Sequence, residues 1–226
     1  MGKTPWNSPV DMIEAVIFDF DGVIADTMHD NCRAWKYAFN LHGFSMNADE
    51  YFRIEGMGRF QIAQHFIERY GLNPHIKEDV VSAKELYYKA NNSFRIFEHV
   101  HEIFTLLKNT KIPIAIVTGA SKERFSKHTD DQILHALSAL VTSDDVKFTK
   151  PHPEPYLKAV ASLGKSAERC LVIENAIFGI QSAKAAGCKC FAITTTMELH
   201  ELKGADKIFT SHKDLLNELE SLLNKQ

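Results

Sequence analysis

The stretch from Ala15 to Ile24 constrains the fold of this chain more than any other feature. Four apolar residues run directly into Asp19 and Asp21, and Gly22 follows at once. A short unbroken apolar run is typical of a buried strand in a parallel sheet that is covered on both faces. Residues two apart on a strand point to the same side, so both carboxylates are predicted to face one site at the carboxyl end of the strand. The alternative is a surface aspartate pair before a turn, because Asp-Gly is also a common turn signature.

The order of the following segments predicts the architecture. Residues 27–97 carry helical spacing of apolar residues and no strand pattern. From residue 100 onward, amphipathic helices alternate with apolar runs that predict strands at Ile112–Val117, Ala139–Thr142, Cys170–Ile173, Cys190–Thr194 and Lys207–Thr210. Such alternation is typical of right-handed βαβ units in a doubly wound, Rossmann-like α/β fold with a parallel sheet. We therefore expect an α/β core domain of residues 1–25 and 99–226, and an inserted all-helical cap domain of residues 26–98 over the catalytic edge.

Composition excludes several classes of protein. The 226 residues carry a net charge of −3, whereas nucleic-acid binding usually requires a clustered basic surface. No apolar run approaches the roughly 20 residues that span a bilayer, and the first residues lack the apolar core of a signal peptide. The four cysteines lack zinc-type spacing, which favours reduced, packed thiols in a cytoplasmic protein. We expect neither a nucleic-acid nor a membrane partner, and a monomer or a weak dimer.

Three further signals stand at the ends of predicted strands. Thr118–Ser121 places a hydroxyl and a glycine at a strand-to-helix turn, where backbone amides form anion sites, although such residues also cap helices. Lys150 lies on a proline-rich loop, where a lysine is more often merely solvated. Glu174 and Asn175 end another strand with oxygen donors that suit a hard cation, or that simply cap the next helix.

Together these four motifs are far more specific than any one of them. Asp-x-Asp-Gly, Thr-Gly, Lys-Pro and Glu-Asn follow successive apolar strands in one order, and this series resembles the haloacid dehalogenase (HAD) superfamily of phosphotransferases. The helical insertion after the first motif is similar to the small helical cap of that superfamily. Phe18–Val23, Arg33–Lys36 and Lys150–Pro153 look most like its β-phosphoglucomutase and sugar-phosphatase branch.

The resemblance implies roles for the motif residues. Asp19 would be the nucleophile that forms an aspartyl-phosphate, and Asp21 the general acid and base. Lys150 would offset charge on the phosphate and on Asp19, and Thr118 would bind phosphoryl oxygens. Mg²⁺ would be the cofactor, because hard cations prefer oxygen ligands. The implied phosphoryl-binding residues beside Thr118 are Gly119, Ala120 and Ser121, and the implied metal ligands are Asp19, the Asp21 carbonyl, Glu174 and Asn175.

The chain departs from the family pattern in three places. Asn175 stands where a carboxylate is common, which predicts a working but weaker metal site. Asn31 occupies the position of a histidine in the mutase, and Glu98-His99 replaces a Pro-Gly pair at the return from cap to core. Gly58-Arg59 resembles the substrate loop of the mutase, so Gly58 and Arg59 are predicted to bind the substrate, with Arg59 on a phosphate remote from the nucleophile.

The sequence therefore predicts a Mg²⁺-dependent phosphatase that hydrolyses small phosphorylated metabolites, in particular sugar phosphates. The first alternative is a phosphosugar isomerase of the β-phosphoglucomutase type, which the absence of the mutase histidine disfavours. The second alternative is a non-catalytic domain that binds phosphorylated metabolites on the same fold. Dehalogenation is disfavoured because it has no need of Asp21. Lys36 and Lys89 are cap lysines without the distinctive context that a phosphonate-cleaving Schiff base would require.

Overall fold

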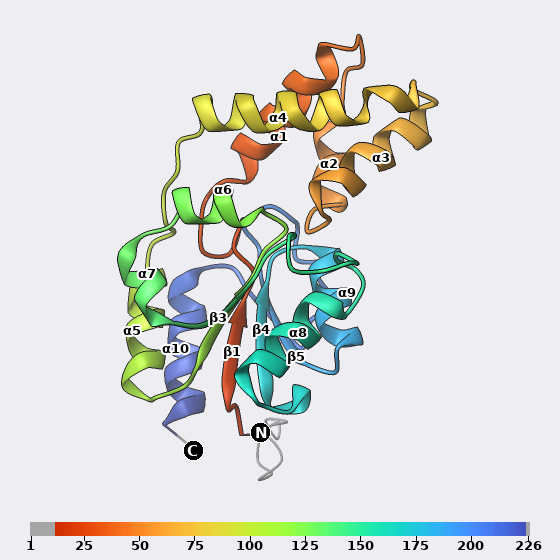
Figure 1. Cartoon of the computed structure of the whole chain (residues 1–226). Helices are drawn as coiled ribbons and strands as arrows, with labels where there is room; N and C mark the ends of the chain where they lie inside the picture. The colour runs from red at the N-terminus through yellow and green to blue at the C-terminus, as the bar shows by residue number, and fades with distance from the viewer. Residues whose placement is uncertain (1–11, 225–226) are drawn as a thin grey trace.

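The computed structural model describes residues 12–224, and within them a six-stranded parallel sheet lies between two layers of helices (Figure 1). The strand order is β3-β2-β1-β4-β5-β6, so the strand that leads into the two aspartates is central. The doubly wound α/β fold is confirmed. The strands are β1 (Ala15–Phe18), β2 (Ile114–Val117), β3 (Leu137–Val141), β4 (Cys170–Glu174), β5 (Lys189–Ile193) and β6 (Lys207–Phe209).

Each face of the sheet is buried under its own helices, because successive side chains of a strand point to opposite faces. Val16 and Phe18 of β1 pack into a cluster with the first layer, and Ala15 and Ile17 pack into a cluster with the second. This two-sided burial explains why β1 is apolar at every position. The first layer contains α5 (Val100–Asn109), α6 (Lys122–Lys127), α7 (Asp131–Ala136) and α10 (His212–Leu223). The second contains α8 (Glu154–Leu163) and α9 (Ile177–Ala185), and the short η3 (Ala167–Arg169) leads from α8 into β4.

The segment between β1 and α5 forms a separate helical layer above the carboxyl edge of the sheet (Figure 1). It has a hydrophobic cluster of its own, with Trp35, Phe39 and Phe66 among its largest buried side chains. We call this segment the cap. Its helices are α1 (Met28–Asn40), α2 (Ala48–Arg53), α3 (Arg59–Tyr70), the short η2 (Pro74–Ile76) and α4 (Lys77–Asn91).

The two connections between cap and core run side by side. Ala25 and Ile96 form an isolated antiparallel bridge, and Phe97 N–H donates to the Ile24 carbonyl at 3.0 Å. His99, at the return into α5, adopts the left-handed conformation with φ 67°. The sequence places a non-glycine residue where the related family has glycine, and the backbone still takes the conformation that glycine favours.

Several boundaries differ from the sequence prediction. The prediction missed α2 and α7, two six-residue helices that begin at the side-chain caps Asn47 and Asp130. The last cap helix, α4, ends at Asn91, before the predicted cap boundary at residue 98. β1 ends at Phe18, so the expectation that both aspartates lie on the strand was wrong.

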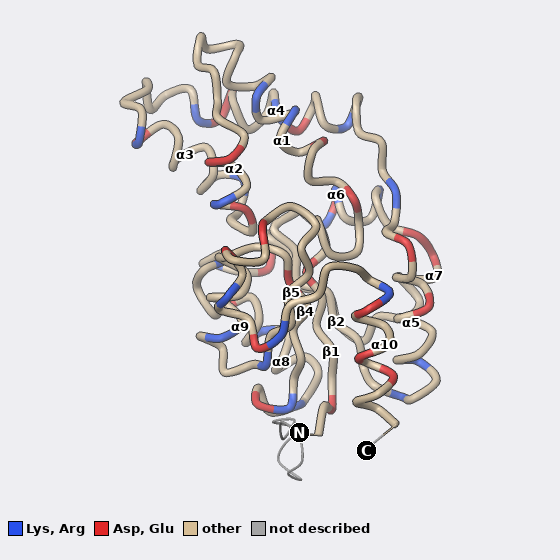
Figure 2. Tube along the Cα trace, turned by 180° about the vertical axis from the view of Figure 1, so that it is seen from behind, with Lys and Arg blue, Asp and Glu red and all other residues tan. Residues whose placement is uncertain are grey.

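Figure 2 shows Lys and Arg interspersed with Asp and Glu along the described trace.

Candidate functional site

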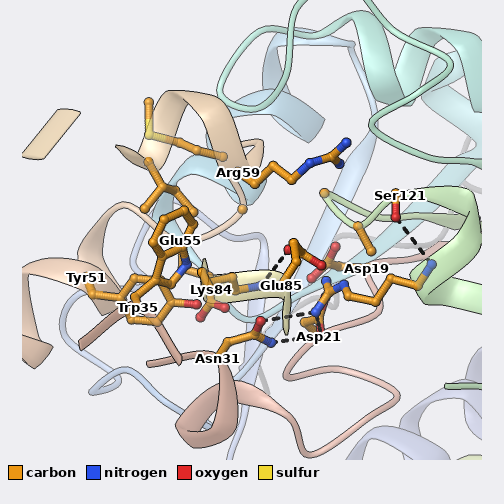
Figure 3. A pocket seen from close by; sticks show the side chains of 16 residues that line it. Asp19, Asp21, Asn31, Trp35, Tyr51, Glu55, Arg59, Lys84, Glu85 and Ser121 are labelled. Atoms are coloured by element: carbon orange, nitrogen blue, oxygen red, sulfur yellow. Dashed lines mark hydrogen bonds and ion pairs between the residues drawn. The ribbon is translucent and has the colours of Figure 1, made fainter. Parts of the chain in front are cut away.

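Asp19 and Asp21 lie at the carboxyl end of β1 and line one pocket between core and cap (Figure 3). They converge through the turn rather than through strand alternation. Asp19 N–H continues the sheet by donating to the Ile173 carbonyl of β4 at 2.9 Å, and Gly22 then takes φ 86°. A Cβ atom at Gly22 would lie 2.1 Å from Asn175 Nδ2, so this turn requires glycine for both its conformation and its space.

Lys150 connects the nucleophile candidate to the fourth motif. Its ammonium group donates to Asp19 Oδ1 at 2.6 Å and to Glu174 Oε1 at 2.7 Å, and its side chain is 2% exposed. Burial raises the pKa of Asp19 to about 7, against the opposing charge of Lys150 and with a further increase from Glu174. The alternative of a solvated lysine on this loop is therefore wrong, because Lys150 is the buried counter-ion of two carboxylates.

Glu174 is fully buried, and four donors occupy both of its oxygens. Oε1 accepts from Lys150 and, at 2.7 Å, from the Tyr156 hydroxyl. Oε2 accepts from the backbone N–H groups of Asn175 and Ala176 at 2.9 and 3.2 Å. In this arrangement Glu174 positions Lys150 and the turn after β4.

Asp21 is held by groups from both core and cap. Arg124 of α6 donates to Asp21 Oδ2 at 2.5 Å, and the Thr27 hydroxyl donates to Oδ1 at 2.5 Å. Asn31 of α1 donates to Oδ1 at 3.3 Å and accepts from Arg124 at 3.1 Å. Burial by itself would raise the pKa of Asp21, but Arg124 and Thr27 outweigh it and lower the pKa below its ordinary value. Thr27 stands at the N-terminus of α1 without capping it, because its hydroxyl donates to Asp21 instead.

The turn after β2 supplies the third wall. Gly119, Ala120 and Ser121 line the pocket with Asp19, whereas Thr118 is buried and lines a smaller crevice together with Lys150. Ala120 N–H donates to the Thr118 hydroxyl at 3.0 Å, and Ser121 caps α6 by accepting from Arg124 N–H at 3.2 Å. Ser121 thus fulfils the capping alternative, and it still faces the pocket.

The loop that joins α2 to α3 is seated directly on the core. Gly58 N–H donates to the Thr149 hydroxyl at 3.1 Å, and Gly56, with φ 89°, lies so close to Lys150 that a Cβ atom would be 3.3 Å from Cδ. Arg59 lines the pocket, but its guanidinium donates to Ser143 Oγ at 3.1 Å and is 3.8 Å from Asp144. These contacts hold the cap against the core.

The residues present fit a hard divalent cation. Asn175 Nδ2 donates to the Thr196 hydroxyl at 3.2 Å, while Asn175 Oδ1 is buried without a hydrogen-bond partner. An unsatisfied buried oxygen beside an excess of carboxylates is a suitable ligand for Mg²⁺. The described residues contain no cluster of three or more His, Cys, Asp or Glu side chains arranged as a metal site. The candidate donors are Asp19, the Asp21 carbonyl and Asn175 Oδ1, whereas the oxygens of Glu174, the fourth predicted ligand, already accept four hydrogen bonds.

Sequence reasoning missed four charged residues of this pocket, namely Glu55, Lys84, Glu85 and Arg124. Arg124 and Glu55 lie in polar stretches that carry no distinctive spacing. Lys84 of α4 lies four residues from both Val80 and Tyr88, so it interrupts a buried helical stripe, and this was a readable signal. Lys84 Nζ is 3.0 Å from Glu85 Oε1 and lies over the rings of Trp35 and Tyr88.

Comparison with known proteins supports this picture. The sequence model of the haloacid dehalogenase-like hydrolases matches residues 16–193. The fructose-1-phosphate phosphatase of Escherichia coli K12 is 28% identical over 76% of this chain and 92% of its own length. The validoxylamine A 7′-phosphate phosphatase of Streptomyces hygroscopicus subsp. limoneus is 29% identical over 90% of this chain and 95% of its own length.

The fold recurs in solved structures. A β-phosphoglucomutase from Clostridium difficile superposes with a TM-score of 0.79, covers 95% of this chain and 98% of its own, and is 24% identical. At that identity the likeness concerns the fold alone.

Among residues 12–224, no helix has the length and apolar character needed to cross a membrane.

Proposed function

The chain belongs to the haloacid dehalogenase-like hydrolase family and is an enzyme of its phosphatase class, and we propose that it is a Mg²⁺-dependent phosphatase of small phosphorylated sugars and polyols. The observation that carries the proposal is the convergence of Asp19, Asp21 and Lys150 at the carboxyl ends of the strands, with Lys150 Nζ 2.6 Å from Asp19. The names of the phosphatase relatives support the class of substrate.

In the first step, an oxygen of Asp19 attacks the phosphorus atom, and an aspartyl-phosphate forms as the bond to the leaving alcohol breaks. Asp21, which the structure favours in its ionised form, first takes up a proton from solvent and then gives it to the departing alkoxide oxygen. Lys150 lies where it offsets negative charge on Asp19 and on the phosphoryl group. A cation on Asp19, the Asp21 carbonyl and Asn175 would neutralise charge on the phosphoryl oxygens.

In the second step, water attacks the aspartyl-phosphate, Asp21 takes a proton from that water, and phosphate leaves with Asp19 restored. Arg124, Thr27 and Asn31 hold Asp21 in position for this role. The ionised form of Asp21 that Arg124 favours is the form required to accept a proton. Gly119, Ala120 and Ser121 lie where they can contact phosphoryl oxygens. Arg59 lines the same pocket, and Gly58 holds its loop against Thr149 of the core.

The direct test is turnover of Asp19→Asn against a panel of hexose, pentose and triose phosphates and nucleotides, with Mg²⁺ and with EDTA. We expect the wild type to be active with Mg²⁺ and inactive with EDTA. Asp19→Asn should show only background activity, although its thermal unfolding transition should match that of the wild type. Asp49→Asn, an exposed aspartate of α2, is the matched control and should keep full activity. Retained turnover by Asp19→Asn would refute the covalent mechanism. No turnover by the wild type would leave the binding domain as the better reading.

The mutase alternative has its own test. The protein is given β-glucose 1-phosphate with a catalytic amount of glucose 1,6-bisphosphate. We expect free glucose and inorganic phosphate, because Asn31 holds Asp21 and Arg124 and cannot take part in acid–base catalysis as a histidine does. Rapid formation of glucose 6-phosphate would favour the mutase.

A cytoplasmic location and a monomeric or weakly dimeric state stay predictions. The four cysteines are buried free thiols.

A further inference from the structure

Glu55 is a buried carboxyl group that the proposed mechanism does not use. It lies in the loop between α2 and α3, lines the same pocket as Asp19 and Asp21, and is 6% exposed. Its Oε2 atom is buried without a hydrogen-bond partner. In Figure 3, Glu55 lies with Trp35 and Tyr51 on the cap side of the pocket, and Asp19 and Asp21 lie on the opposite side.

A structural role does not account for this side chain. The loop is already seated on the core by Gly56 against Lys150 and by the hydrogen bond from Gly58 to Thr149. An unpaired buried carboxyl oxygen opposes folding, since it has lost water and gained nothing in return. Burial and the nearby carboxylates Asp21 and Asp19 raise the pKa of Glu55 well above its ordinary value. Such a group suits a hydrogen-bonding ligand that arrives in the pocket.

The surrounding walls indicate the chemistry of that ligand. Trp35 and Tyr51 offer aromatic surface, which suits the C–H face of a sugar or polyol. The three cations among the described pocket residues already have partners. Lys84 pairs with Glu85, Arg59 contacts Ser143 and Asp144, and Arg124 binds Asp21. A second phosphate or a carboxylate on the substrate would therefore find no unpaired cation among these pocket residues.

We propose that Glu55 determines substrate specificity by binding a hydroxyl of the leaving alcohol, so that phosphate monoesters of neutral polyols and sugars are preferred over those with a second anionic group. This inference rests on the phosphatase function proposed above. The hydroxyl satisfies the Glu55 oxygen in the closed pocket, which ties closure of the cap to the presence of a polyol. Glu55 thus acts on the part of the substrate that departs, away from the transferred phosphoryl group.

The test uses four substrates that share a three-carbon skeleton: glycerol 3-phosphate, propyl phosphate, 3-phosphoglycerate and 3-aminopropyl phosphate. We expect the wild type to prefer glycerol 3-phosphate over the other three. Because a hydrogen bond to a charged or strongly polar group is lost, Glu55→Met should lower kcat/KM for glycerol 3-phosphate by about 10- to 150-fold. Its kcat/KM for propyl phosphate should change by less than about 3-fold, since that substrate has no hydroxyl to lose.

Two further variants separate hydrogen bonding from charge and from folding. Glu55→Gln retains a hydrogen-bonding group and should keep most of the preference for glycerol 3-phosphate. Glu78→Ala removes an exposed glutamate of α4 and should change nothing. Because Glu55→Met removes an unsatisfied polar group, its thermal midpoint should rise by about 2–4 °C without any substrate present.

Each contrary outcome is distinct. An equal loss on all four substrates, or a lower thermal midpoint of Glu55→Met, would show that Glu55 is structural and overturn the inference. A preference for 3-aminopropyl phosphate would mean that Glu55 binds an ammonium group, which also overturns it. An active wild type without any preference would refute the inference alone. Absence of turnover on every phosphate monoester would refute the proposed function, and the inference with it.

Discussion

At the scale of single residues, Asn175 and Glu55 each carry a buried side-chain oxygen without a hydrogen-bond partner. They lie on different sides of the interface between core and cap. The Asn175 oxygen fits a cation, whereas the Glu55 oxygen fits a hydroxyl of the substrate. Each therefore predicts a different ligand and can be altered separately.

Asn175→Asp should lower the stability of the protein without Mg²⁺ and increase the stabilisation that bound Mg²⁺ provides. Without Mg²⁺, a further carboxylate near Asp19 and Glu174 should lower the thermal midpoint, because like charges in a buried site repel. With Mg²⁺, the added charge should tighten binding by about 10-fold, and the stabilisation by saturating metal should grow by about 1.4 kcal/mol. Thermal unfolding and calorimetric titration with Mg²⁺ measure both effects. An unchanged response to Mg²⁺ would show that Asn175 is not a ligand.

Lys84 predicts a pH dependence of stability. Burial, with the charge of Arg124, lowers the pKa of Lys84 from 10.5 to about 8, against the opposing effect of Glu85 and Asp21. Between about pH 8 and 10.5 the unfolded chain holds a proton that the folded protein has released, so this residue destabilises the fold less as the pH rises. Below pH 8 the folded protein bears the full free-energy cost of burying the charged ammonium group of Lys84.

Lys84→Met should therefore stabilise the protein at pH 7 by about 1–3 kcal/mol, since methionine fills the space between Trp35 and Tyr88 without a buried charge. The difference from the wild type should shrink steadily between pH 8 and 10.5. Urea unfolding at each pH measures it, with the exposed Lys89→Met as control. A difference that stays constant with pH would contradict the lowered pKa.

At the scale of the elements, the central strands and their polar ends could be predicted from the sequence, because β1, β2 and β4 are buried on both faces and read as apolar runs. The residues that follow each strand converge for the same topological reason, and they include Asp19, Thr118 and Asn175. β3 is an edge strand and only half buried, so its start at Leu137 left a weaker pattern. The six residues of α2 are too few for a helical period to show.

The rest of the site could not be predicted, because it arises from contacts between segments far apart in the chain. Arg124 meets Asp21 and Asn31 only when α6 and the cap lie together. Arg59 was predicted to bind a remote phosphate from its sequence context; that role stays a prediction, and it competes with the preference for neutral alcohols inferred from Glu55. In the structure its guanidinium is engaged by Ser143 and Asp144, which no local pattern could indicate.

The loop between α2 and α3 predicts that Gly119→Ala impairs closure of the cap. A Cβ atom at Gly119 would lie 3.1 Å from the Met57 carbonyl oxygen, so backbone would have to move. Overpacking of this kind costs about 1–3 kcal/mol, and we expect kcat/KM to fall by about 10-fold through a higher KM. Gly204→Ala, whose Cβ atom would approach the Ile180 side chain of the core at 3.3 Å and no backbone of the cap, is the control. A fall in kcat with unchanged KM would instead place the defect at the phosphoryl group.

At the scale of the whole molecule, the cap and the core line one site together, with Lys150 and Asp21 beneath cap residues. We expect the cap to move away from the core when substrate enters and product leaves. For a good substrate, kcat should therefore decrease as solvent viscosity is raised with sucrose or glycerol. A poor substrate, whose turnover is limited by chemistry, is the control and should show no such decrease. Equal insensitivity of both would indicate that cap motion is not limiting.

The paired connections at Ala25 and Ile96 also bear on how such a chain can change over evolutionary time. Since the chain leaves and re-enters the core at one point, the core needs only a short turn there to remain continuous. An inserted segment can then lengthen, shrink or be exchanged without rearranging the sheet, whose strands pair only with one another. Variation in the cap can thus generate new selectivity upon an inherited reaction centre, and the core retains the chemistry while the insertion diverges.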